Sequence, residues 1–349
     1  LYQPLPESQK IKVQTIRETF IEPFGDLLAG LIIIISIFYL KFNIFHLLIF
    51  LSLLIIIWVF FAILLKNNYI KTIINITNKN KILESSFNFS DKKVLNILKE
   101  KIESSNPKEI IFSLKMLLEY SFEIEEYAIK LLNHQDKEIL SFVLNIIETK
   151  NIIKAKKNVI DIINKNKNPY IKGIAIRTLC ALSENIKLEK ILKFLNTKSI
   201  EMKKEILIGL IKYTGIEGII CAGGYINEFL NSKNYKERIS VAQIIGEVNI
   251  KNFYQPLIRL LKDKNIKVIK ETLNACSKLK NPILIKYIFN KLRYKKIKAF
   301  AMAALIEFKD LTVKYFEKNF YKCDFETKNQ IVKILGDIKT EESIKLLLK

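Results

Sequence analysis

The chain has 349 residues, with 57 Lys or Arg against 35 Asp or Glu, and a formal net charge of +22. Such an excess can indicate contact with nucleic acid, anionic lipid or an anionic solute. A general bias toward Lys, Asn and Ile along the whole chain is the simpler explanation. Two His and four widely spaced Cys, with no CxxC pair, argue against a zinc site and are typical of free thiols in a reducing compartment.

Two apolar runs follow a lead-in of residues 1–22. The first, Phe24–Leu40, contains a single acid, Asp26, and the second, Phe42–Leu65, contains no formal charge. A helix needs about 20 apolar residues to cross a bilayer core. Residues 23–66 therefore predict a transmembrane hairpin with spans at about 24–40 and 42–65. The alternative is a single re-entrant or buried core hairpin in a soluble protein.

Positive charges flank the outer ends of this hairpin. Lys10, Lys12 and Arg17 precede the first span and four lysines follow the second, whereas the turn between the spans carries only Lys41. Both ends are therefore expected on the cytoplasmic side. Because the chain begins with Leu and reaches the hairpin almost at once, we expect it to be the C-terminal part of a longer protein.

Small residues lie on the first predicted span. Gly25 and Ala29 stand four residues apart, and Gly30 stands four residues after Asp26. Such spacing lets another helix approach closely, so we expect packing against upstream transmembrane helices of the same protein. An ionisable residue at such a place faces protein or water. Asp26 either does so or simply lies at the headgroup level.

After a linker of residues 67–90, residues 91–349 change to amphipathic helices separated by short polar breaks. Helix starts recur about every 31 residues at side chains that can accept hydrogen bonds from first-turn amides. The recurring positions are Asn106, Asp136, Asn168, Ser199, Asn234, Asn265, Lys296 and Asp324, of which only Lys296 is not a capping residue. Each unit contains two helices that cannot bury their apolar faces alone, which predicts an α-solenoid.

This array resembles the HEAT repeat family. The resemblance is carried by caps that are followed four positions later by a basic residue. These residues are Lys172, Lys203, Arg238 and Lys328. Such a basic ladder either interlocks neighbouring repeats or lines a nucleic-acid surface, and we expect the first. The glycine-rich stretch TGIEGIICAGGY, residues 214–225, predicts a distorted loop between helices.

The first 30 residues carry a second resemblance, to the segment before the penultimate span of the ATP/ADP carrier family, relatives of the major facilitator transporters. The matching positions are Tyr2, Pro4, Leu5, Glu7, Lys10, Lys12, Pro23 and Gly25. The resemblance implies that Lys10, Lys12 and Asp26 lie along a substrate path. It also implies a lysine where this chain has Asp26. The reversed charge argues against ATP/ADP exchange.

The fold class predicted is all-α, a two-span transmembrane hairpin followed by a HEAT-like solenoid. The resemblances imply the end of a carrier for a nucleotide or another anionic solute, in a bacterial cytoplasmic (inner) membrane. Its lead-in and solenoid would lie in the cytoplasm, where a protein could bind the solenoid. A non-transporting, membrane-anchored scaffold is the alternative, and nucleic-acid binding is a weaker one. No catalytic or cofactor motif stands out, so we expect neither enzymatic activity nor a cofactor.

Overall fold

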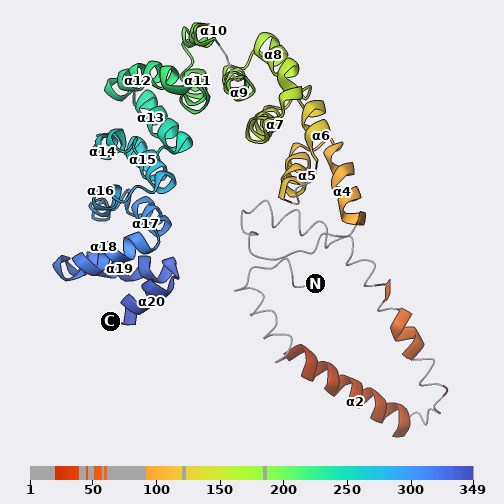
Figure 1. The fold of residues 1–349 in the computed structure, drawn as a ribbon. Helices are drawn as coiled ribbons and strands as arrows, with labels where there is room; N and C mark the ends of the chain where they lie inside the picture. The colour runs from red at the N-terminus through yellow and green to blue at the C-terminus, as the bar shows by residue number, and fades with distance from the viewer. Residues whose placement is uncertain are drawn as a thin grey trace. The chain divides into compact units, whose positions relative to one another are not determined.

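A computed structural model describes residues 20–38, 45, 51–56, 59–60, 92–119, 123–183 and 187–348. The regular structure of these residues is entirely helical, which confirms the all-α prediction (Figure 1). Contacts divide the chain into two units, residues 1–124 and residues 125–349.

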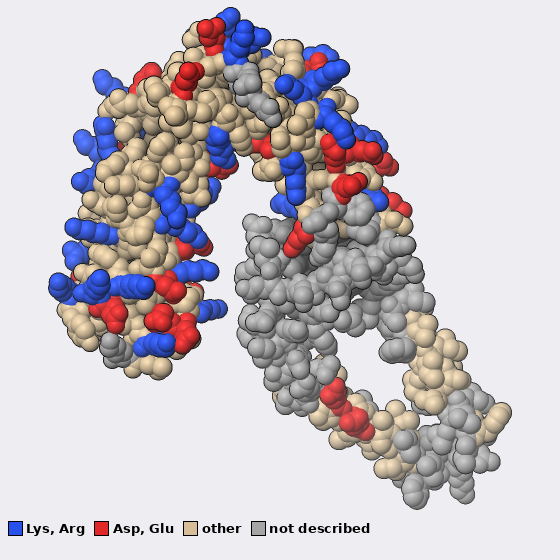
Figure 2. Space-filling model, viewed as in Figure 1, with Lys and Arg blue, Asp and Glu red and all other residues tan. Residues whose placement is uncertain are grey.

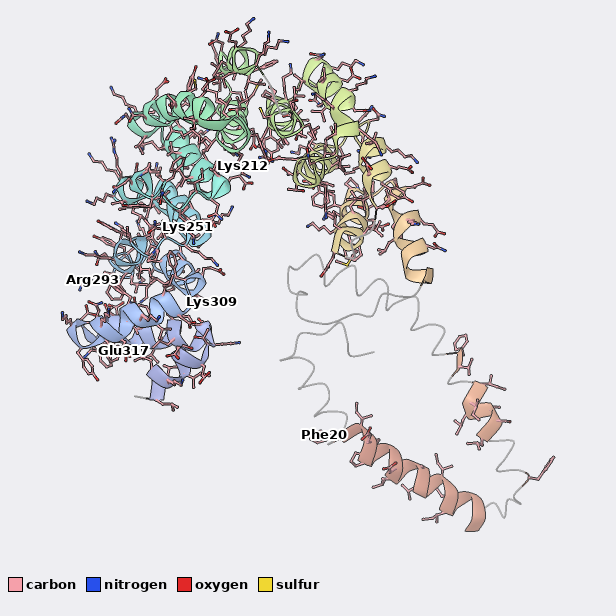
Figure 3. All side chains as sticks on the ribbon, viewed as in Figure 1. Phe20, Lys212, Lys251, Arg293, Lys309 and Glu317 are labelled. Atoms are coloured by element: carbon pink, nitrogen blue, oxygen red, sulfur yellow. The ribbon has the colours of Figure 1, made fainter. Side chains whose placement is uncertain are left out.

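The first unit contains α2 (Glu22–Phe38), α4 (Lys92–Ile102) and α5 (Pro107–Glu119). Helices α4 and α5 pack against each other. Helix α2 is different, because large apolar side chains along it, such as Phe24, Leu27 and Ile34, are more than half exposed. Figure 3 shows Phe20 just before the same helix.

Within the described ranges, we find no helix that combines the length and the apolar character needed to cross a bilayer. Helix α2 covers residues 24–38 of the first predicted span. The second predicted span is described only at residues 45, 51–56 and 59–60, and the linker of residues 67–90 lies outside the described residues. The transmembrane hairpin therefore stays a prediction.

The second unit is a succession of helix pairs in two layers (Figure 1). One layer, here named the capped layer, has each helix packed against the next. It consists of α7 (Lys137–Lys150), α9 (Pro169–Ala181), α11 (Ile200–Tyr213), α13 (Tyr235–Val248), α15 (Ile266–Leu279), α17 (Lys298–Glu307) and α19 (Phe325–Ile338).

The connecting layer holds the intervening helices. They are α6 (Glu125–Leu131), α8 (Lys156–Lys165), α10 (Leu188–Leu192), α12 (Gly215–Asn231), α14 (Gln255–Leu260), α16 (Leu284–Phe289), α18 (Asp310–Asn319) and α20 (Glu341–Leu348). Three short 3-10 helices, η2 (Ile153–Ala155), η3 (Lys193–Leu195) and η4 (Phe320–Lys322), adjoin them. Buried Leu, Ile, Val and Ala side chains fill the space between the layers. This two-layer array of helix pairs is the predicted α-solenoid.

Polar caps define where these helices begin. Seven of the eight predicted cap side chains accept a hydrogen bond from a first-turn amide. The exception is Lys296, because α17 begins after Ile297 without a side-chain cap. Four capped helices, α7, α13, α15 and α19, have 14 residues and end at a residue in the left-handed conformation. In these four helices the cap residue sets the start, and a left-handed residue sets the end at the same distance from the cap.

The predicted loop at residues 214–225 is wrong, because most of these residues form α12. Gly215 has φ of +70°, a conformation that favours glycine and turns the chain from α11 into α12. A Cβ on Gly218 would collide with Thr214 Oγ1 and lie 2.7 Å from the Leu210 carbonyl oxygen. Gly215 and Gly218 therefore serve the tight turn, whereas a Cβ on Gly223 or Gly224 would meet nothing within 4 Å.

Two other glycines allow α9 and α11 to lie close together. A Cβ on Gly173 would lie 3.0 Å from the Cα of Met202, and one on Gly209 would lie 3.0 Å from the Cα of Arg177. A larger residue at either site would therefore require the facing backbone to shift by a few tenths of an ångström. The α9–α11 contact is therefore sensitive to added volume.

We expect Gly173→Ala to lower the free energy of unfolding by about 1–3 kcal/mol, because the methyl group would push α9 away from α11. The matched control is Gly336→Ala in α19, where a Cβ meets nothing within 4 Å. In this control the free energy of unfolding should rise by about 0.5–1 kcal/mol, because alanine has a higher helix propensity than glycine. Urea unfolding of both variants gives the comparison. Equal stabilisation by the two substitutions would contradict the close packing of α9 and α11.

Candidate functional site

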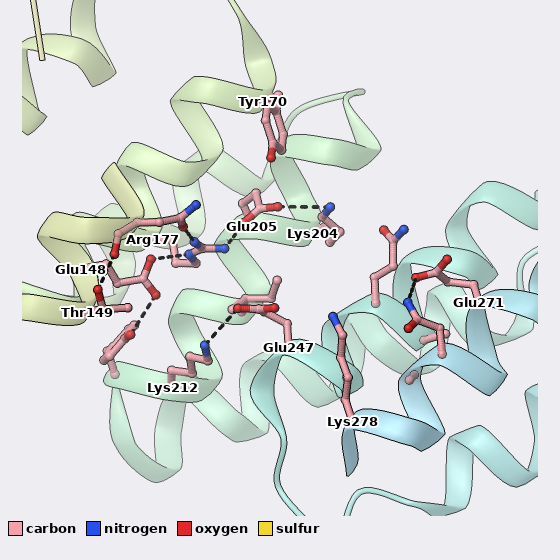
Figure 4. A pocket seen from close by; sticks show the side chains of 18 residues that line it. Glu148, Thr149, Tyr170, Arg177, Lys204, Glu205, Lys212, Glu247, Glu271 and Lys278 are labelled. Atoms are coloured by element: carbon pink, nitrogen blue, oxygen red, sulfur yellow. Dashed lines mark hydrogen bonds and ion pairs between the residues drawn. The ribbon is translucent and has the colours of Figure 1, made fainter. Parts of the chain in front are cut away.

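A polar groove lies across five successive helices of the capped layer, α7 to α15. Its volume is about 420 Å³, and charged and amide side chains dominate its lining (Figure 4). Four lining residues are basic and four are acidic. They are Arg177, Lys204, Lys212 and Lys278, and Glu148, Glu205, Glu247 and Glu271. The groove therefore has no formal net charge.

Small side chains form part of the groove lining at the contact between α13 and α15. Ala242, Gly246 and Ala275 lie there, and a Cβ on Gly246 would come within 3.1 Å of the Cα of Ala275. The two helices therefore pack closely, and the longer polar side chains of the lining lie on either side of this contact.

A buried polar network closes one end of the groove. The Nε of Arg177 donates to Glu148 Oε2 at 2.7 Å, and its two terminal nitrogens donate to Glu205 and to Asn145. The hydroxyl of Tyr213 donates to Glu148 Oε1 at 2.8 Å. The side chains of Arg177, Glu148 and Glu205 are each at most 7% exposed. The network therefore joins α7, α9 and α11 through nearly desolvated charges (Figure 4).

Electrostatic effects hold these groups in fixed protonation states. Burial alone would lower the pKa of Arg177, but the carboxylates of Glu205 and Glu148 outweigh it and raise that pKa. Burial, and then the hydrogen bond to Glu148, raise the pKa of Tyr213. Burial likewise raises the pKa of the neighbouring Cys180 thiol to about 12. Near neutral pH, Arg177 stays charged and the other two groups keep their protons.

The remaining charges sit nearer the groove opening. Lys204 pairs with Glu205 at 3.1 Å, and Lys212 of α11 pairs with Glu247 of α13 at 3.4 Å. Lys278 is exposed and has no carboxylate within 4.0 Å among the residues that the structure describes. Of the two pairs, Lys212 with Glu247 is the more accessible to solvent.

The site residues predicted from the carrier resemblance lie apart from this groove. Lys10 and Lys12 are outside the described residues. Asp26 and Ala29 are exposed on α2, and a Cβ on Gly25 or Gly30 would meet nothing within 4 Å. Their roles in transport and in helix packing stay predictions.

The predicted basic ladder is also separate from the groove. All four residues are half-buried on the first turns of capped helices. Arg238 donates to Asp263 and to the carbonyl oxygen of Ser232, while the Nζ atoms of Lys203 and Lys328 lie 5.9 and 5.5 Å from the ring centroids of Phe229 and Phe320. These three contacts hold parts of the array together. They favour the interlocking interpretation over a nucleic-acid surface. No such contact is found for Lys172 in the described structure.

The groove itself was not predicted from the sequence. Its strongest signal is the presence of charged residues within the apolar pattern of consecutive helices: Glu148 twelve residues after its cap, Arg177 nine after and Glu205 six after. Each position alone is unremarkable on an amphipathic helix. Only the packing of α9 between α7 and α11 brings the three side chains together.

Comparisons with known proteins leave the family open. No protein-family model and no curated protein matches the chain. Among solved structures it is similar to an engineered protein, at 15% identity over 73% of this chain and 81% of that one, with a TM-score of 0.32. It is also similar to human deoxyhypusine hydroxylase in complex with glycerol, at 10% identity over 71% and 96%, with a TM-score of 0.35.

A third similar structure is Kap121p, at 14% identity and a TM-score of 0.35. The match covers 70% of this chain but only 37% of that one. Similarity at this level establishes neither a family nor a function.

We expect Arg177→Met to lower the free energy of unfolding by about 3–5 kcal/mol, because it leaves two buried carboxylates without a cation. The triple variant Arg177→Met, Glu148→Gln, Glu205→Gln removes all three charges together and should recover more than half of that loss. Chemical denaturation of the single and triple variants tests this. A single variant that loses less than about 1 kcal/mol would show that the network does not hold the three helices together.

Proposed function

We propose that the solenoid is a protein-binding scaffold and that its groove takes an extended segment of a partner protein. The observation that carries this proposal is the balanced lining, four cations and four carboxylates over five consecutive helices. A site for a nucleotide or a nucleic acid needs an excess of cations. A polypeptide with side chains of both signs fits a balanced groove better.

Side-chain amides in the groove support a polypeptide ligand. Asn145, Gln243 and Asn274 each stand nine residues after the cap of their own helix, and all three line the groove. Neighbouring helices pack about 8–10 Å apart, so equal register places these amides in a row across α7, α13 and α15. An amide both donates and accepts hydrogen bonds, as does each peptide unit of an extended chain.

We further propose that the first unit attaches the scaffold to a membrane. The support is α2, on which large apolar side chains such as Phe24 and Leu31 are 64% and 47% exposed. Transport of a nucleotide or another anion rests on the carrier resemblance alone, and part of its motif lies outside the described residues. A membrane-anchored scaffold is therefore the function that the described residues favour.

To test the groove, peptides that bind the full chain are selected from a random library, and their affinity is compared between two variants. Asn274→Trp places a bulky ring in the groove and should weaken binding at least tenfold. Asn227→Trp, on an exposed position of α12 in the connecting layer, should leave it unchanged. Peptides that bind both variants equally well would rule out the groove as their site.

To test membrane attachment, Leu31→Arg is compared with the original chain. A charge at the centre of a bilayer costs about 2.5–3.5 kcal/mol, so we expect the variant to move from the membrane pellet to the supernatant after an alkaline wash. The control is Leu348→Arg, at an 84% exposed position of α20. If Leu31→Arg sediments with membranes as fully as the control, α2 is not embedded in lipid.

A further inference from the structure

A lysine stands directly before the recurring helix-start position in five consecutive repeats. These residues, here named the cap-lysine row, are Lys167, Lys198, Lys233, Lys264 and Lys295. All five are exposed, and within the described part of the chain none has a carboxylate within 4.0 Å. They differ in this from the predicted basic ladder, whose members are half-buried.

The capped helices place this row along one edge of the solenoid. Helices α9, α11, α13, α15 and α17 pack successively side by side, so their starts share that edge. At about 8–10 Å per helix, the row extends over about 30–40 Å. The helix N-termini beneath it add partial positive charge. Figure 2 shows Lys and Arg side chains projecting in succession along the flank of the array from α12 to α18.

Further cations reinforce the same edge. Residues 291–298, KLRYKKIK, contain five basic residues and no acidic one. Burial, and then repulsion by Lys262 of the preceding repeat, lower the pKa of Lys291. Cations of neighbouring repeats therefore crowd one another, and a bound polyanion would relieve this repulsion.

Two acidic residues on this edge, Asp263 and Asp324, have other basic partners. Asp263 is held by Arg238 at 2.6 Å, and Asp324 lies 3.7 Å from Arg293 while it caps α19. Figure 3 labels Arg293 on one flank of the array and Lys251 and Lys309 on the other. Five exposed lysines therefore recur at one register position at the starts of the capped helices, without a carboxylate within 4.0 Å in the described structure.

Large apolar and aromatic side chains are exposed at several of the same helix starts and at the next one along the array. Tyr321 and Phe325 flank the start of α19 and are 82% and 80% exposed, and Tyr294 stands between two cations at 58%. Ile266 is exposed at the start of α15. Lysines interleaved with exposed aromatic and aliphatic side chains are typical of protein surfaces that bind in the headgroup region of a bilayer.

We propose that this edge of the solenoid rests on an anionic lipid surface, with the cap-lysine row at the headgroups. The alternative polyanion, duplex DNA, carries one charge per about 1.7 Å, far denser than one lysine per helix. Nor does a phosphate backbone offer a partner for Ile266 or Phe325. The inference does not rest on the groove, and it adds a second contact to the membrane attachment proposed for α2.

The first test is lysine acylation of the full chain, followed by mass spectrometry, with vesicles of phosphatidylcholine alone or with 30% phosphatidylserine. Both vesicles offer the same hydrocarbon to α2, so its attachment is held constant. We expect acylation of the cap-lysine row to slow at least fivefold on the anionic vesicles and to recover in 0.5 M NaCl. Lys157, Lys187 and Lys251, exposed at the other ends of the capped helices, serve as internal controls.

The second test compares two variants of equal net charge. The triple variant Lys233→Gln, Lys264→Gln, Lys295→Gln should lower the ratio of affinities for anionic and neutral vesicles about 100-fold, at about fivefold for each lysine. The control triple Lys157→Gln, Lys187→Gln, Lys251→Gln should change that ratio less than threefold. Equal losses in both triples, or acylation that vesicles leave unchanged while duplex DNA slows it, would overturn the proposal.

Discussion

The hydrogen bond from a cap side chain to the first-turn amides is the interaction on which the solenoid depends. It fixes where each capped helix begins, and helix geometry then fixes every later position relative to that start. Consecutive capped helices pack side by side. Residues that stand the same number of positions from their own caps therefore lie level with one another across the array. Residues nine positions after a cap share the groove, whereas residues one position before it share the edge. A single local interaction thus sorts side chains into functional surfaces.

The Arg177 network shows where this array departs from simple stacking. Burying a guanidinium with two carboxylates gives little net stability compared with apolar packing, since desolvation offsets most of the attraction. The network instead fixes the relative arrangement of α7, α9 and α11, because a shift of one helix along another would leave a buried charge unpaired. It lies at the end of the groove where α9 and α11 are already held close by Gly173 and Gly209. The end of the proposed binding site is therefore rigid, and its more exposed pairs, such as Lys212 with Glu247, are at the centre and far side.

Local signals made the repeats predictable. Caps, proline at the first helical position and helical periodicity act within one turn, and seven of the eight predicted caps accept the expected bonds. The glycine-rich stretch misled the prediction because Gly215 and Gly218 serve a turn whose tightness depends on Thr214 and Leu210. The groove was missed because it depends on which helices become neighbours. The carrier motif remains a resemblance, since most of its residues lie outside the described ranges.

The net charge of +22 first suggested only a compositional bias, and composition alone could not have separated a bias from a binding surface. The position of each charged residue relative to its helix cap helps to distinguish a compositional bias from a binding surface. The groove holds equal numbers of cations and carboxylates, while the edge formed by the helix starts holds lysines that stand without carboxylate partners in the described structure. This difference in charge fits the two partners proposed, a polypeptide of mixed charge in the groove and an anionic surface at the edge.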